Sequence, residues 1–147
     1  MLDESNDIYS NYSFLLEKTG KRIRQYAKRK FRDHGFAITI DQWSVLKAIY
    51  QTAPVSQVDL AQYCHKDTPT LTRILDILVQ KKLATRNADS HDRRKQLVEL
   101  TAEGSQMVMS MLPHVRNIRM QAWQHLDAED FQHFVRILHT IYQNLED

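Results

Sequence analysis

Residues 89–104 read DSHDRRKQLVELTAEG, and this stretch is the most informative part of the chain. A polar turn with two acids and three successive bases leads into a segment in which Val98 and Leu100 can share one buried face. With a short strand before the turn, the pattern predicts a β-hairpin that points cations outward. Adjacent guanidinium groups repel each other, so we expect a polyanion as partner, with Asp89 or Asp92 holding an arginine in place. We interpret the hairpin as a DNA-contacting wing; the alternative is an ordinary charged surface turn.

The segment before this hairpin predicts a helix-turn-helix unit. Ser56 and Asp59, three residues apart, form a capping-box pair at the start of a short helix. A turn over residues 64–66 ends that helix. Its apolar side is expected to consist of Val58, Leu60, Ala61 and Tyr63.

The second helix of the unit, over residues 68–81, is the candidate recognition helix. Asp67 or Thr68 can cap it, and Pro69 suits its first turn because the missing N–H would have no partner there. Helical spacing turns one apolar stripe inward, namely Leu71, Ile74, Leu75 and Leu78. Hydroxyls and an arginine remain on the other faces, where they suit phosphates and base edges in a major groove. The candidate DNA-binding residues of helix and wing are Thr68, Pro69, Thr70, Thr72, Arg73, His91, Arg93, Arg94 and Lys95.

Six short fragments follow one another in a distinctive order between Ile38 and Gly104. They read ITIDQWSVL from 38, DLA from 59, TLTRILD from 70, LATR from 83, DRR from 92 and LTAEG from 100. Through them the chain resembles the MarR family of winged helix-turn-helix transcriptional regulators. The resemblance implies a mainly α fold with a small β-hairpin wing and with N- and C-terminal dimerisation helices. It also implies a homodimeric bacterial or archaeal repressor, with its recognition helix in the major groove and its wing arginines near the adjacent minor groove.

One position departs from the pattern of the family. The family usually has glycine just before the leucine that begins the wing, but this chain has Lys82 there. The glycine of the family implies a left-handed backbone conformation at this position, so we expect Lys82 to adopt it, at a cost of roughly 1 kcal/mol because lysine carries a side chain.

Residues 1–147 suit a single domain, and a content of only three glycines and three prolines favours helices over many-turned β structure. We place the DNA-binding lobe at about residues 38–101 and the dimerisation helices at about residues 5–33 and 102–147. The first helix should run from about Asp7 to Arg32. Its apolar stripe is Ile8, Tyr12, Leu15, Thr19, Ile23, Tyr26 and Phe31.

The C-terminal flank carries two further apolar stripes. Pro113 should kink the helix of the first stripe, which is Val108, Met111, Val115, Ile118 and Ala122. The second follows a cap from Asp127 to Asp130 and consists of Phe131, Phe134, Leu138, Ile141 and Leu145. A small winged module cannot bury so many stripes alone, so we expect a helical homodimer interface, with packing inside one chain as the alternative.

The distribution of charge favours a nucleic-acid partner. The whole chain has a net charge of only +2, but residues 66–95 hold eight bases against four acids. This concentration of cations predicts binding to double-stranded DNA, and a dimer would bind a pseudo-palindromic operator. A second basic cluster lies in the first helix, where it is either a solvated surface or the positive lining of an effector site. This cluster is Lys18, Lys21, Arg22, Arg24, Lys28, Arg29, Lys30 and Arg32.

Other classes of protein find little support in the sequence. No apolar run approaches the roughly 20 residues that cross a bilayer, and the N-terminus is acidic, so we expect a cytoplasmic protein with no membrane partner. Motifs for catalysis are missing and no two histidines lie four residues apart on one helix, so we expect no enzyme, cofactor or metal. Three alternatives remain: a redox- or metal-responsive regulator of the same fold, a small helical metal-binding protein or enzyme, and a protein-interaction module without DNA binding. The redox alternative rests on Cys64, whose thiolate could be favoured beside His65 and Lys66; the other interpretation of Cys64 is a partly buried packing residue.

The resemblance also implies a site for a small-molecule effector between the dimer helices and the DNA-binding lobe. Here that junction would join the first helix, the loop at Phe36 and the helix beginning at Asp41. Aromatic faces with cations nearby suit a small aromatic acid or a phenol. The alternative is that the same aromatic side chains simply fill the core. The predicted effector-binding residues are Tyr12, Tyr26, Phe36, Trp43 and Leu46.

Overall fold

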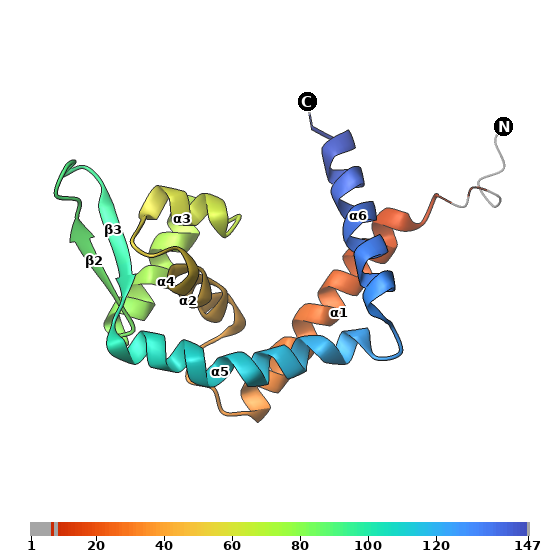
Figure 1. Cartoon of the computed structure of the whole chain (residues 1–147), viewed down its shortest axis with the longest axis horizontal. Coiled ribbons are helices and arrows are strands. Elements are labelled where there is room, and N and C mark those ends of the chain that lie inside the picture. Colours follow the sequence, from red (N-terminus) through yellow and green to blue (C-terminus); the bar gives the residue numbers. More distant parts are fainter. Residues whose placement is uncertain (1–6, 8, 147) are drawn as a thin grey trace.

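The computed structural model describes residue 7 and residues 9–146, so Ile8 of the first predicted stripe lies outside the described residues. The chain is mainly helical with one small antiparallel sheet, which confirms the predicted fold class (Figure 1). In chain order the elements are α1 (Tyr12–Asp33), α2 (Ile40–Thr52), β1 (Val55–Ser56), α3 (Gln57–Tyr63), α4 (Thr68–Gln80), β2 (Ala84–Ala88), β3 (Gln96–Leu100), α5 (Ala102–Met120), η2 (Gln121–Trp123) and α6 (Ala128–Asn144).

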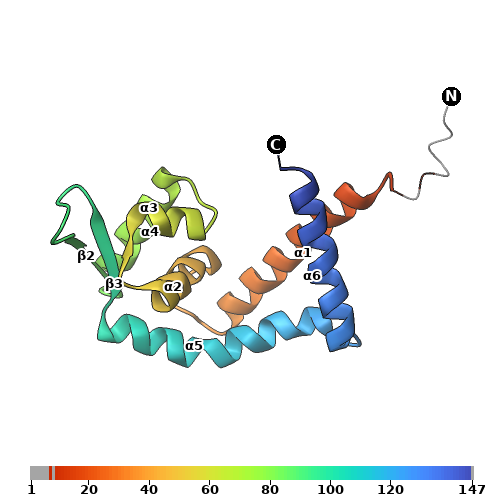
Figure 2. The ribbon, with the colours of Figure 1, turned by 45° about the horizontal axis from the view of Figure 1, so that its top comes forward.

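The elements form a winged lobe and a helical part that lie at opposite ends of the molecule. α2, α3, α4 and the sheet make the lobe, from which β2 and β3 project as a hairpin (Figure 1). α5 runs along the lobe and beyond it, and α1 and α6 lie at the end away from the hairpin (Figure 2). Among the described residues, no helix combines the length and the apolar composition that crossing a membrane requires.

The core of the lobe joins α4 to the sheet. All four residues that were predicted to face inward from α4 are buried, as is Val98 of β3. The strand order is β1-β3-β2, and Val98 pairs with Val55 on one side and with Arg86 on the other. One hydrophobic cluster therefore positions the candidate recognition helix relative to the hairpin.

Side-chain caps fix where the helices of the lobe begin. The Oδ1 of Asp67 accepts a hydrogen bond from the N–H of Thr70 at 2.8 Å, so Asp67 rather than Thr68 caps α4. The Oγ of Ser56 accepts from the N–H of Asp59 at 3.1 Å, which is one half of the predicted capping box.

The prediction for the apolar side of α3 was partly wrong. Leu60 and Ala61 are buried, but Val58 and Tyr63 are 63% and 54% exposed. Val58 precedes Leu60 by two positions and therefore lies on nearly the opposite side of a helix with about 3.6 residues per turn.

The connection from α4 to the wing is held by the start of α5. Lys82 has the left-handed φ that the sequence predicted, 61°. Thr101 donates from its Oγ1 to the carbonyl oxygen of Lys82 at 2.7 Å, and from its N–H to that of Leu83 at 3.1 Å. Gly104 lies so close to Leu83 that a Cβ at this position would overlap the Leu83 carbonyl oxygen. The LTAEG fragment thus attaches α5 to the base of the wing.

The terminal helices leave much of their apolar surface exposed. α1 begins at Tyr12 and not near Asp7, because Asp7 accepts the N–H of Tyr9 in a turn before the helix. Phe31 is the one buried residue of α1 among those described, and α6 has none. The α6 cap is the predicted pair, Asp127 and Asp130.

α5 contributes its inner face to the core. The helix extends from Ala102 to Met120 and continues through Pro113. Four residues of the predicted stripe are buried, whereas Ala122 lies beyond the helix in η2 and is exposed. The buried four are Val108, Met111, Val115 and Ile118.

Candidate nucleic-acid interface

The outer face of α4 carries the residues predicted to contact DNA. Thr68, Pro69 and Arg73 are exposed, and Thr70 and Thr72 are half-buried. The hydroxyl of Thr72 accepts a hydrogen bond from Nε2 of Gln57 at 2.9 Å. Thr72 therefore also holds α4 against the start of α3, a role that the sequence did not suggest.

Arg86 attaches the wing to α4. Its Nη1 lies 2.7 Å from Oδ1 of Asp76, and its Nη2 donates to the backbone carbonyl oxygen of Thr72 at 3.2 Å. Arg86 was not among the predicted site residues. Strand alternation could have identified it, because Arg86 shares a face with Ala84 and lies opposite the buried Val98, where a guanidinium needs a partner.

The two acids of the wing stabilise its turn and not an arginine. Oδ1 of Asp89 accepts the backbone N–H of His91 at 2.9 Å, and Oδ1 of Asp92 accepts that of Arg94 at 3.0 Å. Within the part of the chain that the structure describes, neither acid forms an ion pair. The prediction that one of them holds an arginine side chain was therefore wrong, because short acidic side chains in a turn bond more readily to backbone N–H groups two residues on.

A groove of about 360 Å³ lies between the wing, the start of α3 and the start of α4. Arg94 and Lys95 line it from the wing, and Thr68 lines it from the start of α4. Arg93 and His91 are exposed on the same hairpin but do not line this groove. The structure thus gathers Thr68, Arg94 and Lys95 of the predicted DNA-binding set on one concave surface, where the two cations are accompanied by one acid, Asp59 of α3.

The electrostatics at the start of α4 favour an ionised cap. The backbone N–H of Thr70 bonds to the Asp67 carboxylate, and this bond holds the pKa of Asp67 below its ordinary value. The charge of Arg73 acts in the same direction. Asp67 therefore remains an acceptor for the helix N–H groups at neutral pH.

A second cavity, of about 480 Å³, lies at the junction of α1 with the lobe. Phe31 and Phe36 supply apolar lining, and Lys81 reaches it from the end of α4. Three more cations come from the basic cluster of α1 at a spacing of four residues, so they share one face of the helix: Arg24, Lys28 and Arg32. This spacing is the signal by which the sequence could have identified the lining.

The predicted effector residues are not gathered in this cavity. Phe36 lines it, but Trp43 and Leu46 are buried in the core of the lobe, with exposed fractions of 6% and 0%. Tyr26 lies beneath the cationic groups of Arg29 and Lys30, and Tyr12 is exposed at the start of α1.

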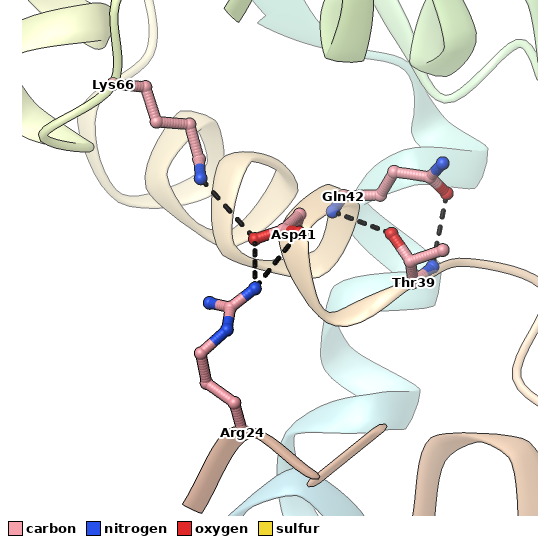
Figure 3. A network of polar contacts seen from close by, with 5 residues as sticks. All are labelled: Arg24, Thr39, Asp41, Gln42 and Lys66. Atoms are coloured by element: carbon pink, nitrogen blue, oxygen red, sulfur yellow. Dashed lines mark hydrogen bonds and ion pairs between the residues drawn. The ribbon is translucent and has the colours of Figure 1, made fainter. Parts of the chain in front are cut away.

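Asp41 is the acid of this cavity, and it contacts cations from two elements (Figure 3). Nη2 of Arg24 lies 3.3 Å from both carboxylate oxygens, and Nζ of Lys66 lies 3.5 Å from Oδ1. Partial burial raises the pKa of Asp41, but the hydrogen bonds and charges of Arg24 and Lys66 outweigh it and hold that pKa below its ordinary value. The neighbouring capping box of Thr39 and Gln42 fixes the start of α2 independently.

Cys64 does not have the electrostatics expected of a redox sensor. Burial raises the pKa of its thiol, and the opposing charge of Lys66 does not compensate. These electrostatics favour the partly buried packing role of Cys64 over the redox-sensor alternative. Among the described residues, no group of three or more His, Cys, Asp or Glu side chains is placed to hold a metal ion.

Comparison with known proteins identifies the family. The model of the MarR family matches residues 38–95. A Listeria innocua protein of unknown function is 31% identical over 94% of this chain and 95% of its own, with a TM-score of 0.71. MepR of S. aureus, in complex with DNA, is 25% identical over 91% of this chain and 98% of its own, with a TM-score of 0.82. BpsR of Bordetella bronchiseptica, whose DNA binding is regulated by 6-hydroxynicotinic acid, is 25% identical over 95% of this chain and 97% of its own, with a TM-score of 0.83. The chain belongs to the MarR family.

The MarR match covers the lobe from the end of the α1–α2 loop to the wing turn. The structural likeness extends further, through the terminal helices, because it spans more than nine-tenths of this chain in each of the three comparisons. This MarR chain therefore has the fold of a transcriptional regulator along its length, and the resemblance first noted from short fragments is confirmed.

Proposed function

We propose that this protein is a sequence-specific regulator of transcription, a homodimeric repressor that binds double-stranded DNA and is released by a small aromatic or anionic effector. The observation that carries the proposal is the groove shared by Arg94 and Lys95 of the wing and Thr68 of α4. A duplex that received α4 in its major groove would bring its phosphates to these cations. The exposed side chain of Arg73 would then be available to a base edge.

DNA binding is tested by selection from a random duplex library, followed by fluorescence anisotropy with the selected duplex at several salt concentrations. We expect a pseudo-palindrome whose half-sites lie about 34–36 Å apart, because two symmetry-related helices enter successive major grooves. Affinity should fall steeply with salt, since phosphate contacts release counterions. Salt-independent binding, or protection of a single half-site, would contradict the proposal.

The homodimer is supported by the exposed apolar side chains of the terminal helices. Leu15 and Ile23 of α1 are 56% and 53% exposed, and Phe131 and Phe134 of α6 are 49% and 44% exposed. A second copy of the chain would remove such surface from water. Sedimentation equilibrium should give a dimer for the wild type and a monomer for Ile23→Glu, which introduces a charge into this surface.

The effector is proposed to bind in the 480 Å³ cavity, whose volume lies in the range of small-molecule sites of about 300–1,000 Å³. Its aromatic and cationic lining suits an aromatic acid, so 6-hydroxynicotinic acid, which regulates BpsR, is the first probe. Isothermal titration calorimetry should report saturable binding. Thermodynamic linkage requires that the acid weaken DNA binding by the same factor by which DNA weakens binding of the acid. If the acid saturated the protein while DNA affinity stayed unchanged, binding of the acid would not control DNA binding, and the effector part of the proposal would be wrong.

A further inference from the structure

The Asp41 carboxylate connects α1 to the turn that precedes α4. Arg24 belongs to α1, whereas Lys66 immediately precedes Asp67, the cap of α4 (Figure 3). Both cations contact the same carboxylate, and Oδ1 is common to the two contacts. Asp41 therefore contacts both α1 and the residue that precedes the cap of the candidate recognition helix.

The contact between Arg24 and Asp41 is suited to exchange. A single nitrogen, Nη2, contacts both carboxylate oxygens at 3.3 Å, which is longer than the roughly 2.7–2.9 Å of a strong charge-assisted hydrogen bond. The Arg24 side chain is 64% exposed and lines the cavity. A ligand carboxylate in the cavity could use two guanidinium nitrogens at once, a geometry that Asp41 does not achieve.

Asp41 would keep favourable surroundings after losing Arg24. It lies in the first turn of α2, where the helix dipole and free N–H groups stabilise negative charge. Lys66 is on its other side, and the Asp41 side chain is 44% exposed to water. Displacement from Arg24 therefore does not leave a buried, unpaired charge.

We propose that Asp41 is an internal competitor of the effector: a ligand carboxylate in the cavity displaces Asp41 from Arg24, and this exchange disconnects α1 from the turn that begins α4. The inference rests on the effector site of the proposed function and names the ligand class and the displaced residue.

Lys81 gives the cavity a second connection to α4. It caps the C-terminal end of α4, and its Nζ donates to the carbonyl oxygen of Ala37 in the wall of the cavity. Lys66 and Lys81 thus link the two ends of the same helix to the surroundings of one cavity. A bound anion that attracts Lys81 and displaces Asp41 would act on both ends of α4 together.

The proposal is tested with benzoate and its neutral analogue benzamide on the full-length protein, by isothermal titration calorimetry. Asp41→Asn keeps the shape of the side chain and removes its charge, and the cap of α2 stays in place because it belongs to Thr39. We expect Asp41→Asn to bind benzoate about two- to fivefold more tightly than the wild type, since an exposed ion pair no longer competes. Affinity for benzamide should not change.

Glu103→Gln is the matched control, because it removes one negative charge from the first turn of another helix, α5. The benzoate affinity of Glu103→Gln should equal that of the wild type. Arg24→Gln should abolish benzoate binding both in the wild type and in Asp41→Asn. The proposal would be overturned if Asp41→Asn bound benzoate no more tightly than the wild type. It would also be overturned if neither the wild type nor Asp41→Asn bound benzoate. DNA affinity is measured separately, so a wild type that binds no DNA would contradict the proposed function without deciding the competition.

A second measurement needs no variant. The pKa of Asp41, followed by the NMR shift of its carboxyl carbon, should rise toward its ordinary value when benzoate is added, because Arg24 no longer holds the ionised form. Benzamide should leave it unchanged. A pKa that does not move when benzoate saturates the protein would show that Arg24 and Asp41 remain together, and the proposal would be wrong.

Discussion

The guanidinium of Arg86 in β2 lies 2.7 Å from the carboxylate of Asp76 in α4. The same guanidinium donates to the backbone carbonyl oxygen of Thr72, one turn earlier in α4. The Arg86 side chain is only 24% exposed, so these bonds are partly shielded from water. The orientation of the wing relative to α4 thus depends on a polar clamp as well as on the shared hydrophobic core.

Arg86→Met should loosen this clamp while keeping a long apolar side chain. We expect the free energy of unfolding to fall by about 1–3 kcal/mol, as for lost hydrogen bonds of a charged group, and DNA affinity to fall as well. Urea denaturation and anisotropy measure the two effects. Arg93→Met is the control, because Arg93 is exposed in the same hairpin and should cost little stability. An Arg86→Met protein as stable as the wild type would mean that the core alone positions the wing.

Arg94→Ala should weaken binding to most DNA sequences, because the wing is expected to supply phosphate contacts and not base contacts. The slope of the logarithm of affinity against the logarithm of salt concentration should become shallower by about 2, because one phosphate contact is lost in each subunit of the dimer. Arg116→Ala, which removes an exposed arginine from α5, should leave the slope unchanged. Circular dichroism must first show that both variants fold. If folded Arg94→Ala bound DNA as tightly as the wild type, the wing hypothesis would be wrong.

Local sequence patterns predicted the framework of the lobe well. The stripe of α4 was found because a helix that is buried on one side repeats its apolar residues every three or four positions. The left-handed Lys82 was predicted from a departure at a single position, and its φ of 61° confirms it. The stripe depends only on neighbours in the chain, whereas the conformation of Lys82 was expected because the MarR family usually has glycine at this position.

Features that depend on distant residues were not predictable in the same way. The cavity at the junction combines Arg24 of α1 with Lys81 of α4, residues that are far apart in the sequence. Trp43 and Leu46 were expected in an effector site, but both are buried in the core of the lobe. An apolar residue in the sequence looks the same whether it lines a ligand site or fills the core. Asp89 was expected to bind an arginine side chain, but it accepts the backbone N–H of His91. A carboxylate in a turn can accept a hydrogen bond from a backbone N–H as well as from a guanidinium, and the sequence does not show which donor it meets.

Substitution of Gly104 and of Gly20 by alanine should change the free energy of unfolding in opposite directions. A Cβ at Gly104 would overlap the carbonyl oxygen of Leu83, so Gly104→Ala should lower the free energy of unfolding by about 1–3 kcal/mol. Gly20 lies inside α1 with nothing within 4 Å of an added Cβ among the described residues, so Gly20→Ala should raise it by about 0.5–1 kcal/mol. Chemical denaturation of both variants checks the signs. A stable Gly104→Ala would show that α5 can move away from the base of the wing at little cost.

Cys64 should behave as a slowly reacting thiol. Burial raises its pKa, so the thiolate, which is the reactive form, should become abundant only at a higher pH than for an ordinary cysteine. Alkylation by iodoacetamide at pH 8 should therefore be slower in the folded protein than in urea, where the thiol is solvated. Lys66→Met should slow it further, because the charge of Lys66 lowers the pKa. The pH profile of the alkylation rate is the deciding measurement: a midpoint below that of the unfolded chain would restore the redox-sensor hypothesis, whereas a midpoint above it leaves Cys64 as a residue that packs against the core.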